Sequence, residues 1–274
     1  MKKRLVFAIV ALTVINTSLY AQFGLGRFGK SKPSSAQPIG QPADMVTLIT
    51  IATDQGMKAM DIMATVFPPE IISQFEETSK KYHELQSHRQ DGNIDADQVQ
   101  VASDAFAEFA KLDVDWQSYR KEKAEVVPQA DHRLALMLLA DGLAATTIPS
   151  TVQSLQAEVT SISSNLFQLN RAMQLKTTIQ LLVVVGKQMP NQVESFKTVR
   201  GIAKKIAAAE NMTLPPDPPA DSLKDTATAS KDIITLLPPD SPAVTPNTPA
   251  AAPEAVPAAS IVSVASSASS GTKE

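Results

Sequence analysis

The chain contains no cysteine among its 274 residues. Without cysteine there is no disulfide framework and no thiol chemistry, so its stability must come from packing alone. An excess of basic residues is also lacking, since 25 Lys and Arg stand against 28 Asp and Glu. This composition argues against a nucleic-acid-binding protein, which would show clustered positive charge, and against a polybasic membrane-surface module.

Histidine is scarce as well, and the three present, His83, His88 and His132, do not have the spacing of a metal site. His83 and His88 are five residues apart, which on a helix points them about 140° away from each other. Structural metal sites normally show several ligands at close spacing. We therefore expect no metal and no cofactor.

Catalytic signatures are missing too. No serine stands in a G-x-S-x-G context, which a nucleophile elbow requires. Pairs of acidic residues do occur, but lysines and arginines lie close to most of them, a pattern typical of the solvated face of a helix. The pairs are Asp104 with Glu108, Glu76 with Glu77, and Asp113 with Asp115. The sequence thus predicts that the protein is not an enzyme.

Residues 1–21 have the three parts of a secretory signal peptide. Basic residues occupy positions 2–4, an apolar run extends from Leu5 to Ile15, and Ala21 precedes the expected cut. The run is shorter than the roughly 20 residues of a membrane-spanning helix, which favours cleavage over anchoring. Cleavage removes three basic residues and no acid, so 22 basic and 28 acidic residues leave a net charge of −6. We expect an exported protein, periplasmic or extracellular and bacterial.

Beyond the signal, composition divides the chain into three zones. Residues 22–42 are rich in Gly, Pro and Ser, which predicts a flexible leader. Residues 43–212 are rich in helix-forming residues and predict a helical bundle domain. Residues 213–274 form a low-complexity tail of Pro, Ala, Ser and Thr, for which we expect disorder. Within the tail, residues 222–237 have the pattern of a short helix with an apolar end that docks on the bundle or on a partner.

The leader contains a motif that resembles a nucleotide-binding loop. Residues Gly24 to Ser31 satisfy both G-x-x-x-x-G-K-[ST] and G-x-G-x-x-G. A phosphate-binding loop needs a strand before it and a helix after it. Here the signal peptide precedes the motif and three prolines follow it, so we interpret the segment as leader.

Prolines punctuate the middle zone, because proline lacks an amide donor and is best accommodated in the first turn of a helix. Pro68-Pro69, Pro128, Pro149 and Pro190 each predict a break, and the Asp91-Gly92-Asn93 turn predicts one more. The predicted helices cover 43–66, 70–90, 95–125, 130–147, 150–187 and 191–211. Two of the starts have capping-box spacing: Asp95 with Gln98, and Asn191 with Glu194.

The helix predicted over 150–187 carries the most regular apolar pattern. Seven residues spaced alternately by three and four lay a narrow coiled-coil-like seam along one face. These candidate interaction residues are Val152, Leu155, Val159, Ile162, Leu166, Leu169 and Met173. Such a seam serves either to close a bundle or to pair with another molecule, and the sequence leaves both open.

The predicted fold is an all-α, elongated antiparallel helical bundle with one long coiled-coil-like helix, between a disordered leader and a disordered tail. The predicted function is that of a structural or protein-interaction module of the bacterial cell envelope, whose partner is another protein or a second copy. The first alternative is a secreted membrane-active helical protein that inserts 134–145 or 179–185 into lipid, although neither stretch reaches spanning length. The second alternative is an exported hydrolase.

Overall fold

The computed structural model describes residues 41–89, 92–162 and 168–238. All regular structure in these ranges is helical, which confirms the predicted all-α class. The α-helices are α2 (Pro42–Ala64), α3 (Pro69–Ser87), α4 (Ala96–Ala110), α5 (Val127–Ile162), α6 (Leu169–Ala209) and α7 (Thr226–Leu236). The predicted signal peptide, the motif in the leader and the tail beyond residue 238 lie outside the described residues.

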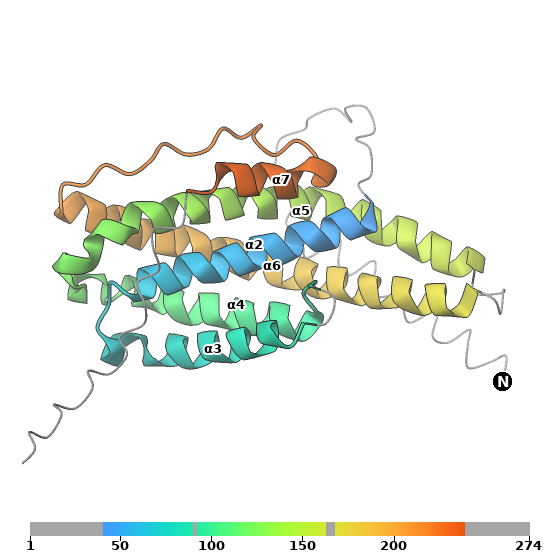
Figure 1. The fold of residues 1–274 in the computed structure, drawn as a ribbon, viewed down its shortest axis with the longest axis horizontal. Coiled ribbons are helices and arrows are strands. Elements are labelled where there is room, and N and C mark those ends of the chain that lie inside the picture. Colours follow the sequence, from blue (N-terminus) through green and yellow to red (C-terminus); the bar gives the residue numbers. More distant parts are fainter. Residues whose placement is uncertain (1–40, 90–91, 163–167, 239–274) are drawn as a thin grey trace, which may run out of the picture. The chain divides into compact units, whose positions relative to one another are not determined.

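The helices form an antiparallel bundle around one core. Helices α2 to α6 alternate in direction along the chain, whereas α7 runs in the same direction as α6, and α2, α4, α5 and α6 surround the core (Figure 1). Helix α3 packs on α4, while α7 packs on α2 and α5. Helices α5 and α6 contain 36 and 41 residues, against 23 in α2 and 15 in α4. They therefore continue past the ends of α2 and α4 as a two-helix extension (Figure 1).

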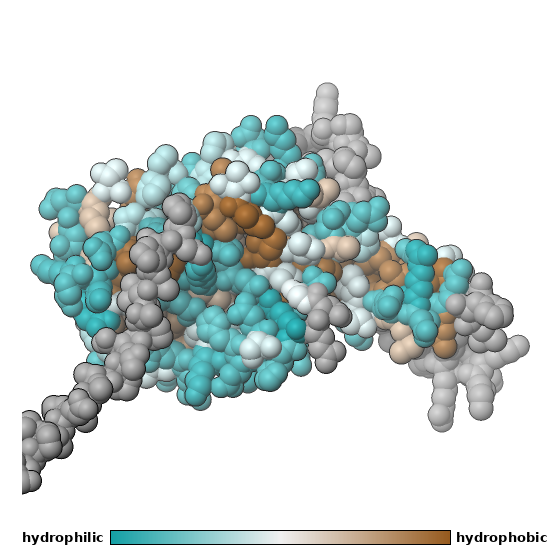
Figure 2. All heavy atoms as spheres, in the orientation of Figure 1, coloured by the Kyte–Doolittle hydropathy of each residue, from teal (hydrophilic) through white to brown (hydrophobic). Residues whose placement is uncertain are grey.

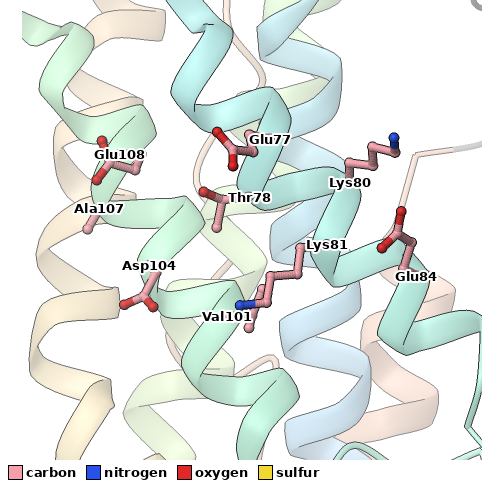
Figure 3. A pocket seen from close by; sticks show the side chains of 9 residues that line it. All are labelled: Glu77, Thr78, Lys80, Lys81, Glu84, Val101, Asp104, Ala107 and Glu108. Atoms are coloured by element: carbon pink, nitrogen blue, oxygen red, sulfur yellow. The ribbon is translucent and has the colours of Figure 1, made fainter.

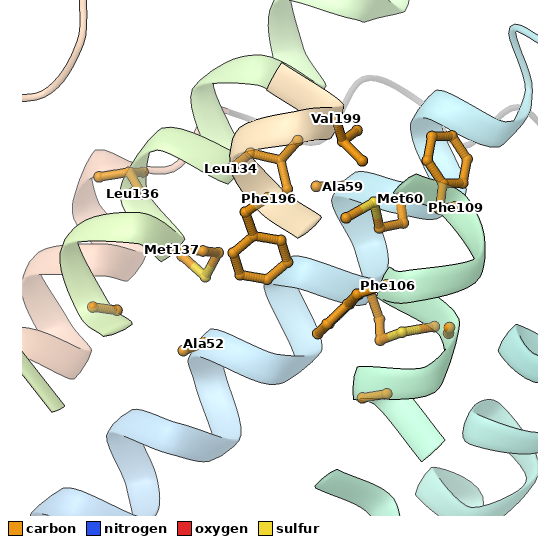
Figure 4. Close-up of a cluster of buried hydrophobic side chains, with 14 of the residues drawn as sticks. Ala52, Ala59, Met60, Phe106, Phe109, Leu134, Leu136, Met137, Phe196 and Val199 are labelled. Atoms are coloured by element: carbon orange, nitrogen blue, oxygen red, sulfur yellow. The ribbon is translucent and has the colours of Figure 1, made fainter. Parts of the chain in front are cut away.

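Large apolar side chains from all four inner helices meet in the core. Figure 4 shows Met60 of α2 and Phe109 of α4 in this cluster, with Met137 of α5. The rings of Phe106 and Phe196 join α4 to α6, with centroids 4.8 Å apart. Fully burying a side chain of this size contributes about 1.5–3 kcal/mol, so packing of this kind replaces the disulfides that the chain lacks.

Local signals fix several helix ends. The predicted capping box at the start of α4 is confirmed, since the Asp95 carboxylate accepts from the Gln98 amide and the Gln98 side chain accepts from the Asp95 amide. Gly92 before it has a φ of 70°, a conformation that glycine adopts without strain. Helix α6 ends at Ala209, and two residues later Asn211 has a φ of 56°. The Met212 amide donates back to the Ala207 carbonyl at 2.8 Å. This is a Schellman ending, with asparagine in the left-handed position.

Two of the predicted breaks are wrong, because Pro149 lies inside α5 and Pro190 lies inside α6. Asn191 is consequently not a helix start either. Both prolines are at least partly exposed, so water can satisfy the carbonyl that each leaves unbonded. Buried residues such as Ile148 and Val152 continue on both sides of Pro149. Packing of this face against α6 outweighs the roughly 3 kcal/mol that a proline costs an isolated helix.

The helix predicted over 95–125 ends early, at Ala110. The next residues form three short 3-10 helices, Lys111–Asp113, Trp116–Ser118 and Lys121–Val126. Arg120 holds this segment against the end of α2, because its backbone amide donates to Val66 at 2.7 Å and its guanidinium donates to Thr65 at 2.6 Å. The segment therefore crosses one end of the bundle instead of extending α4.

The compact unit also extends further than composition predicted. Helix α7, which the sequence pattern over 222–237 predicted, lies against α2 and α5, so the unit ends at Pro238 and not at residue 212. Ile233 is the large apolar residue that α7 buries fully.

Gly56 marks the closest packing between α2 and its neighbours. A Cβ atom at this position would lie 2.8 Å from Cζ of Phe196 and 3.1 Å from Cζ of Phe106. Both rings are fully buried. Neither ring can move aside without displacing other core side chains, because protein cores are close-packed.

We expect the substitution Gly56→Ala to destabilise the protein by about 1–3 kcal/mol, because overpacking outweighs the better helix propensity of alanine. The matched control is Gly142→Ala in α5, where a Cβ would meet nothing within 4 Å. That change should stabilise the helix by about 0.5–1 kcal/mol. Urea unfolding followed by circular dichroism measures both, and equal effects of the two substitutions would contradict this account of Gly56.

Candidate functional site

The predicted seam does not lie on one helix. Helix α5 ends at Ile162 and α6 begins at Leu169, so the helix predicted over 150–187 is wrong. Val152, Leu155, Val159 and Ile162 belong to α5, whereas Leu169 and Met173 belong to α6, which runs back in the opposite direction (Figure 1). Leu166 lies outside the described residues. The residues predicted as one continuous stripe are thus divided between the two sides of a helical hairpin.

The hairpin keeps its register over its whole length. Near the start of α5, Arg200 donates to both carboxylate oxygens of the buried Asp131, at 2.9 and 3.1 Å. At the other end, Arg171 forms an ion pair with Glu158. The stretch of α5 between these two pairs is nearly as long in sequence as the stretch of α6 that runs back between them. The two helices therefore lie side by side from one pair to the other.

We define the arm as residues 150–162 of α5 and 169–180 of α6, the part of the hairpin that continues past α2 and α4 (Figure 1). At its root the seam is buried, with Val152 and Leu155 only 6% and 1% exposed. At its tip the seam is exposed, since Leu169 and Met173 are 54% and 60% accessible. The same stripe is therefore core at one end and surface at the other.

The arm carries little charge. Uncharged polar residues make up about half of it, and only three of its residues are charged: Glu158, Arg171 and Lys176. Glu158 and Arg171 pair with each other across the hairpin. In Figure 2 the arm, at the right of the view, shows apolar atoms among polar ones. Covering this surface would desolvate few charges, and burying an unpaired charge is the costliest part of forming an interface.

Hydroxyl groups on the arm are satisfied within their own helices. Six of its seven serine and threonine side chains donate to a backbone carbonyl three or four residues earlier. They are Ser150, Thr151, Thr160, Ser161, Thr177 and Thr178. A polar group that already has a partner loses little when water is removed from it, whereas an unsatisfied one costs about 1–3 kcal/mol.

The most extensive polar network of the described chain lies between α2 and α3, away from the arm. The guanidinium of Arg89 donates to both carboxylate oxygens of Asp54, at 2.8 and 2.9 Å. The hydroxyl of the fully buried Tyr82 donates to the same carboxylate. Burial and the Asp54 carboxylate raise the pKa of the Tyr82 phenol, so it stays protonated. This network joins α3 to α2, and its carboxylate is already bonded to both Arg89 and Tyr82.

A serine, an aspartate and a histidine meet beside this network, but not in the order that catalysis needs. Ser79 donates to one oxygen of Asp61 at 2.7 Å, and His83 contacts the other oxygen at 2.8 Å. In a hydrolase the imidazole lies between the hydroxyl and the carboxylate. Here the carboxylate is in the middle, and its hydrogen bond raises the pKa of His83. Ser79 therefore bonds to the carboxylate and not to the imidazole that acts as the base in a triad.

The carboxylate pair Asp104 and Glu108 lies in a surface hollow of about 750 Å³ between α3 and α4 (Figure 3). Asp104 accepts from Gln100 at 2.9 Å, and Glu108 accepts from Lys111 at 2.6 Å. The hollow is open and carries both charge signs. It is lined by Glu77, Thr78, Lys80, Lys81, Glu84, Val101, Asp104, Ala107 and Glu108. A general acid needs an apolar pocket that raises its pKa, which this surface does not provide.

The other predicted polar candidates are spread over the molecule. Asp113 forms an ion pair with Lys205 at 2.6 Å. His88 caps the end of α3, and His132 of α5 contacts the carbonyl of Leu236 at 3.1 Å. Within the described ranges no three His, Asp or Glu side chains are grouped in a way that would hold a metal ion.

Asp141 is the one carboxylate placed in an apolar interior among the described residues. It is 4% exposed, and its Oδ2 atom has no hydrogen-bond partner in the part of the chain that the structure describes. A cavity of about 10 Å³ beside it is lined mainly by aliphatic residues together with Thr53 and Gln192, and no other ionisable group lines it. Room for about one water molecule does not make a substrate pocket. Burial alone raises the pKa of Asp141 to about 8.

Asp141 should make stability depend on pH. Because its pKa is raised by folding, its ionisation favours unfolding as pH rises from about 4 to about 8. The substitution Asp141→Asn removes this penalty. We expect the variant to gain stability over the wild type across this range, on the order of 5 kcal/mol at pH 8. Urea unfolding at pH values from 5 to 9 measures the difference.

Asp217 provides the control, because Arg200 lowers the pKa of its exposed carboxyl. Its contribution is lost as pH falls, so the substitution Asp217→Asn should change stability little and in the opposite sense. A gain for Asp141→Asn that is the same at pH 5 and pH 9 would contradict the assignment to Asp141 ionisation.

Comparisons with protein-family models, with curated proteins and with solved structures give no match to this chain. The residues and their geometry are therefore the basis on which its function is inferred.

Proposed function

We propose that this chain is an exported, non-enzymatic helical-bundle protein that serves as a structural or interaction module of the bacterial cell envelope. Its contact surface in this proposal is the arm, and its partner is a second copy of the chain. The export rests on the signal-peptide pattern of residues 1–21.

The observation that carries the proposal is the change in exposure along the seam, from the buried Leu155 to the exposed Leu169 and Met173. A hairpin of two helices buries only the sides that face each other. Two such hairpins side by side make a four-helix arrangement, in which apolar residues at a narrow seam pack into one another.

The low charge of the arm permits a second copy as the occupant. The mature chain has an expected net charge of −6, so two bodies that approach each other repel. The arm has one acidic and two basic residues, so two arms meet almost without repulsion. Glu158 and Arg171 also have opposite signs, and either can pair with its counterpart on another arm.

The test is the solution mass of residues 22–274 by light scattering, for the wild type and for the double substitution Leu169→Glu with Met173→Glu. We expect the wild type to be a dimer or larger and the variant to be a monomer of unchanged helicity, because both positions are exposed and the added carboxylates repel across the contact.

The matched control is Val114→Glu, because Val114 is 86% exposed and lies between two 3-10 helices at the far end of the bundle from the arm. It should leave the mass of the assembly unchanged. A wild type that is monomeric at several hundred micromolar, or an arm variant with the mass of the wild type, would refute assembly through the arm.

A membrane-active protein is the second candidate, and one observation favours it. Among the described residues, the stretch Lys121–Ile162, which contains α5, is long and apolar enough to cross a bilayer, with a mean hydropathy of 1.4 over its best 18 residues. Half of that window is buried inside the bundle, as the core helix of a soluble protein would be. Asp141 lies within this helix, and a charge at mid-bilayer is costly.

This second candidate predicts release of a trapped dye from vesicles of phosphatidylethanolamine and phosphatidylglycerol. Release should be greater at pH 5 than at pH 9, because Asp141, with a pKa of about 8, is neutral at the lower pH. The variant Asp141→Asn should release dye equally at both. Intact vesicles at both pH values would remove this candidate.

A further inference from the structure

Helix α7 binds the rest of the molecule through one narrow face. The residues that it buries, Thr226, Ala229, Ser230 and Ile233, recur at intervals of three, one and three. This is one stripe of a helix. Three of the four are small and only Ile233 is large, so α7 lies close to α2 and α5 while burying little apolar surface. We call the surface of α2 and α5 beneath it the α7 groove.

The connection to α7 is long and has no regular structure. Residues 213–225 separate α7 from the turn that ends α6, and four of them are prolines. An 11-residue helix is too short to be stable alone, so α7 owes its helical form to docking in the groove. Thirteen residues span up to roughly 45 Å when extended, which is enough to reach a neighbouring molecule.

A few polar contacts fasten this segment at its ends. Asp217 forms an ion pair with Arg200, and the Leu236 carbonyl contacts Nε2 of His132 at 3.1 Å. Two other polar atoms at the interface are not satisfied. The buried Oγ of Ser230 and Nδ1 of His132 have no hydrogen-bond partner among the described residues. Buried polar atoms without partners weaken an interface, which lowers the free-energy cost of releasing α7 from the groove.

We propose that the α7 groove is a binding site for a helix with this stripe, and that it accepts α7 from a second copy of the chain. A helix that fits the groove of its own molecule makes the same contacts in the groove of an identical one, and two copies that exchange α7 form a symmetric dimer. Because the 13-residue connection tethers α7 to its own molecule, it gives each molecule's own α7 an effective concentration of about millimolar. Exchange therefore appears when copies are crowded together, as pairing of the arms would bring about.

Binding to the groove is tested with a fluorescent peptide of residues 213–238. In the substituted chain Ile233→Lys the chain's own α7 is displaced, and we expect saturable, micromolar binding of the peptide by fluorescence anisotropy. The wild-type chain, whose groove is filled, should bind at least tenfold more weakly. A peptide with the same Ile233→Lys change should not bind. Absence of binding to a chain whose helicity is intact would overturn the proposal.

A second form of this test needs no destabilising change. A protease site in place of residues 220–222, all of which are exposed or half-exposed, allows the connection to be cut in the folded protein. The cut segment should then be replaced by the labelled peptide. Two outcomes would overturn the proposal. In one, the cut segment stays bound and the peptide never replaces it. In the other, the cut segment leaves and the empty groove does not bind the peptide.

Exchange between copies is tested by cross-linking, which the absence of native cysteine makes simple. The pair His132→Cys and Leu236→Cys lies across the α5–α7 contact, and a short bis-maleimide joins the two. Dilute protein should give a cross-linked monomer, and protein concentrated to the millimolar range should give a cross-linked dimer. The experiment is repeated in the chain with Leu169→Glu and Met173→Glu, where the dimer should still form at the highest concentration.

That repetition separates the two surfaces, because loss of arm pairing leaves α7 exchange possible. A monomer at every concentration in both backgrounds would overturn exchange between copies. If the peptide nevertheless binds, the groove would belong to a helix of another protein, and the proposed occupant would be wrong.

Discussion

The antiparallel pairing of α5 and α6 is the constraint on which the rest of the molecule depends. At one end it is held by Asp131 and Arg200, a pair that is buried and bonded at both oxygens. Removing one partner of such a pair strands the other charge in the interior, at a cost of about 3–5 kcal/mol. Because the two helices are in register there, every later turn is in register too, and the position of the arm follows. The other helices fit onto this pair and are shorter than it is.

The same constraint explains why two prolines fail to end their helices. Proline removes one backbone hydrogen bond, but it does not interrupt the face that a helix presents to its neighbour. Pro149 and Pro190 both lie on the solvent side, whereas Ile148 and Met189 beside them are buried. A prediction of helix ends from proline considers only the isolated helix. Here the tertiary contacts of the buried face keep both helices continuous.

Composition and capping chemistry predicted the class of the fold, the start of α4 and a short helix over 222–237, for which docking on the bundle or on a partner was left open. The capping box at Asp95 was predictable because its partners are three residues apart and need no tertiary contact. Asn191 and Glu194 have the same spacing but lie inside α6. Packing of α6 against its neighbours outweighs the capping box that these two residues could form. The hairpin was missed because the apolar spacing of three and four residues continues in the sequence from α5 into α6. The run Ser163-Ser164-Asn165, of residue types that favour turns, was the signal that should have divided it.

The arm, as the proposed contact surface, illustrates why such a surface is harder to find in a sequence than a catalytic site. Catalysis requires particular groups at particular spacings, and those that this chain brings together, such as Ser79, Asp61 and His83, are in the wrong order. A contact surface is defined by what it lacks. Along the arm the charges are few or paired and the hydroxyls are satisfied by their own backbone, so water can leave at little cost. Each property is ordinary by itself. The arm differs from the charged faces of the body because these properties occur together at the exposed end of a seam whose other end is buried in the core.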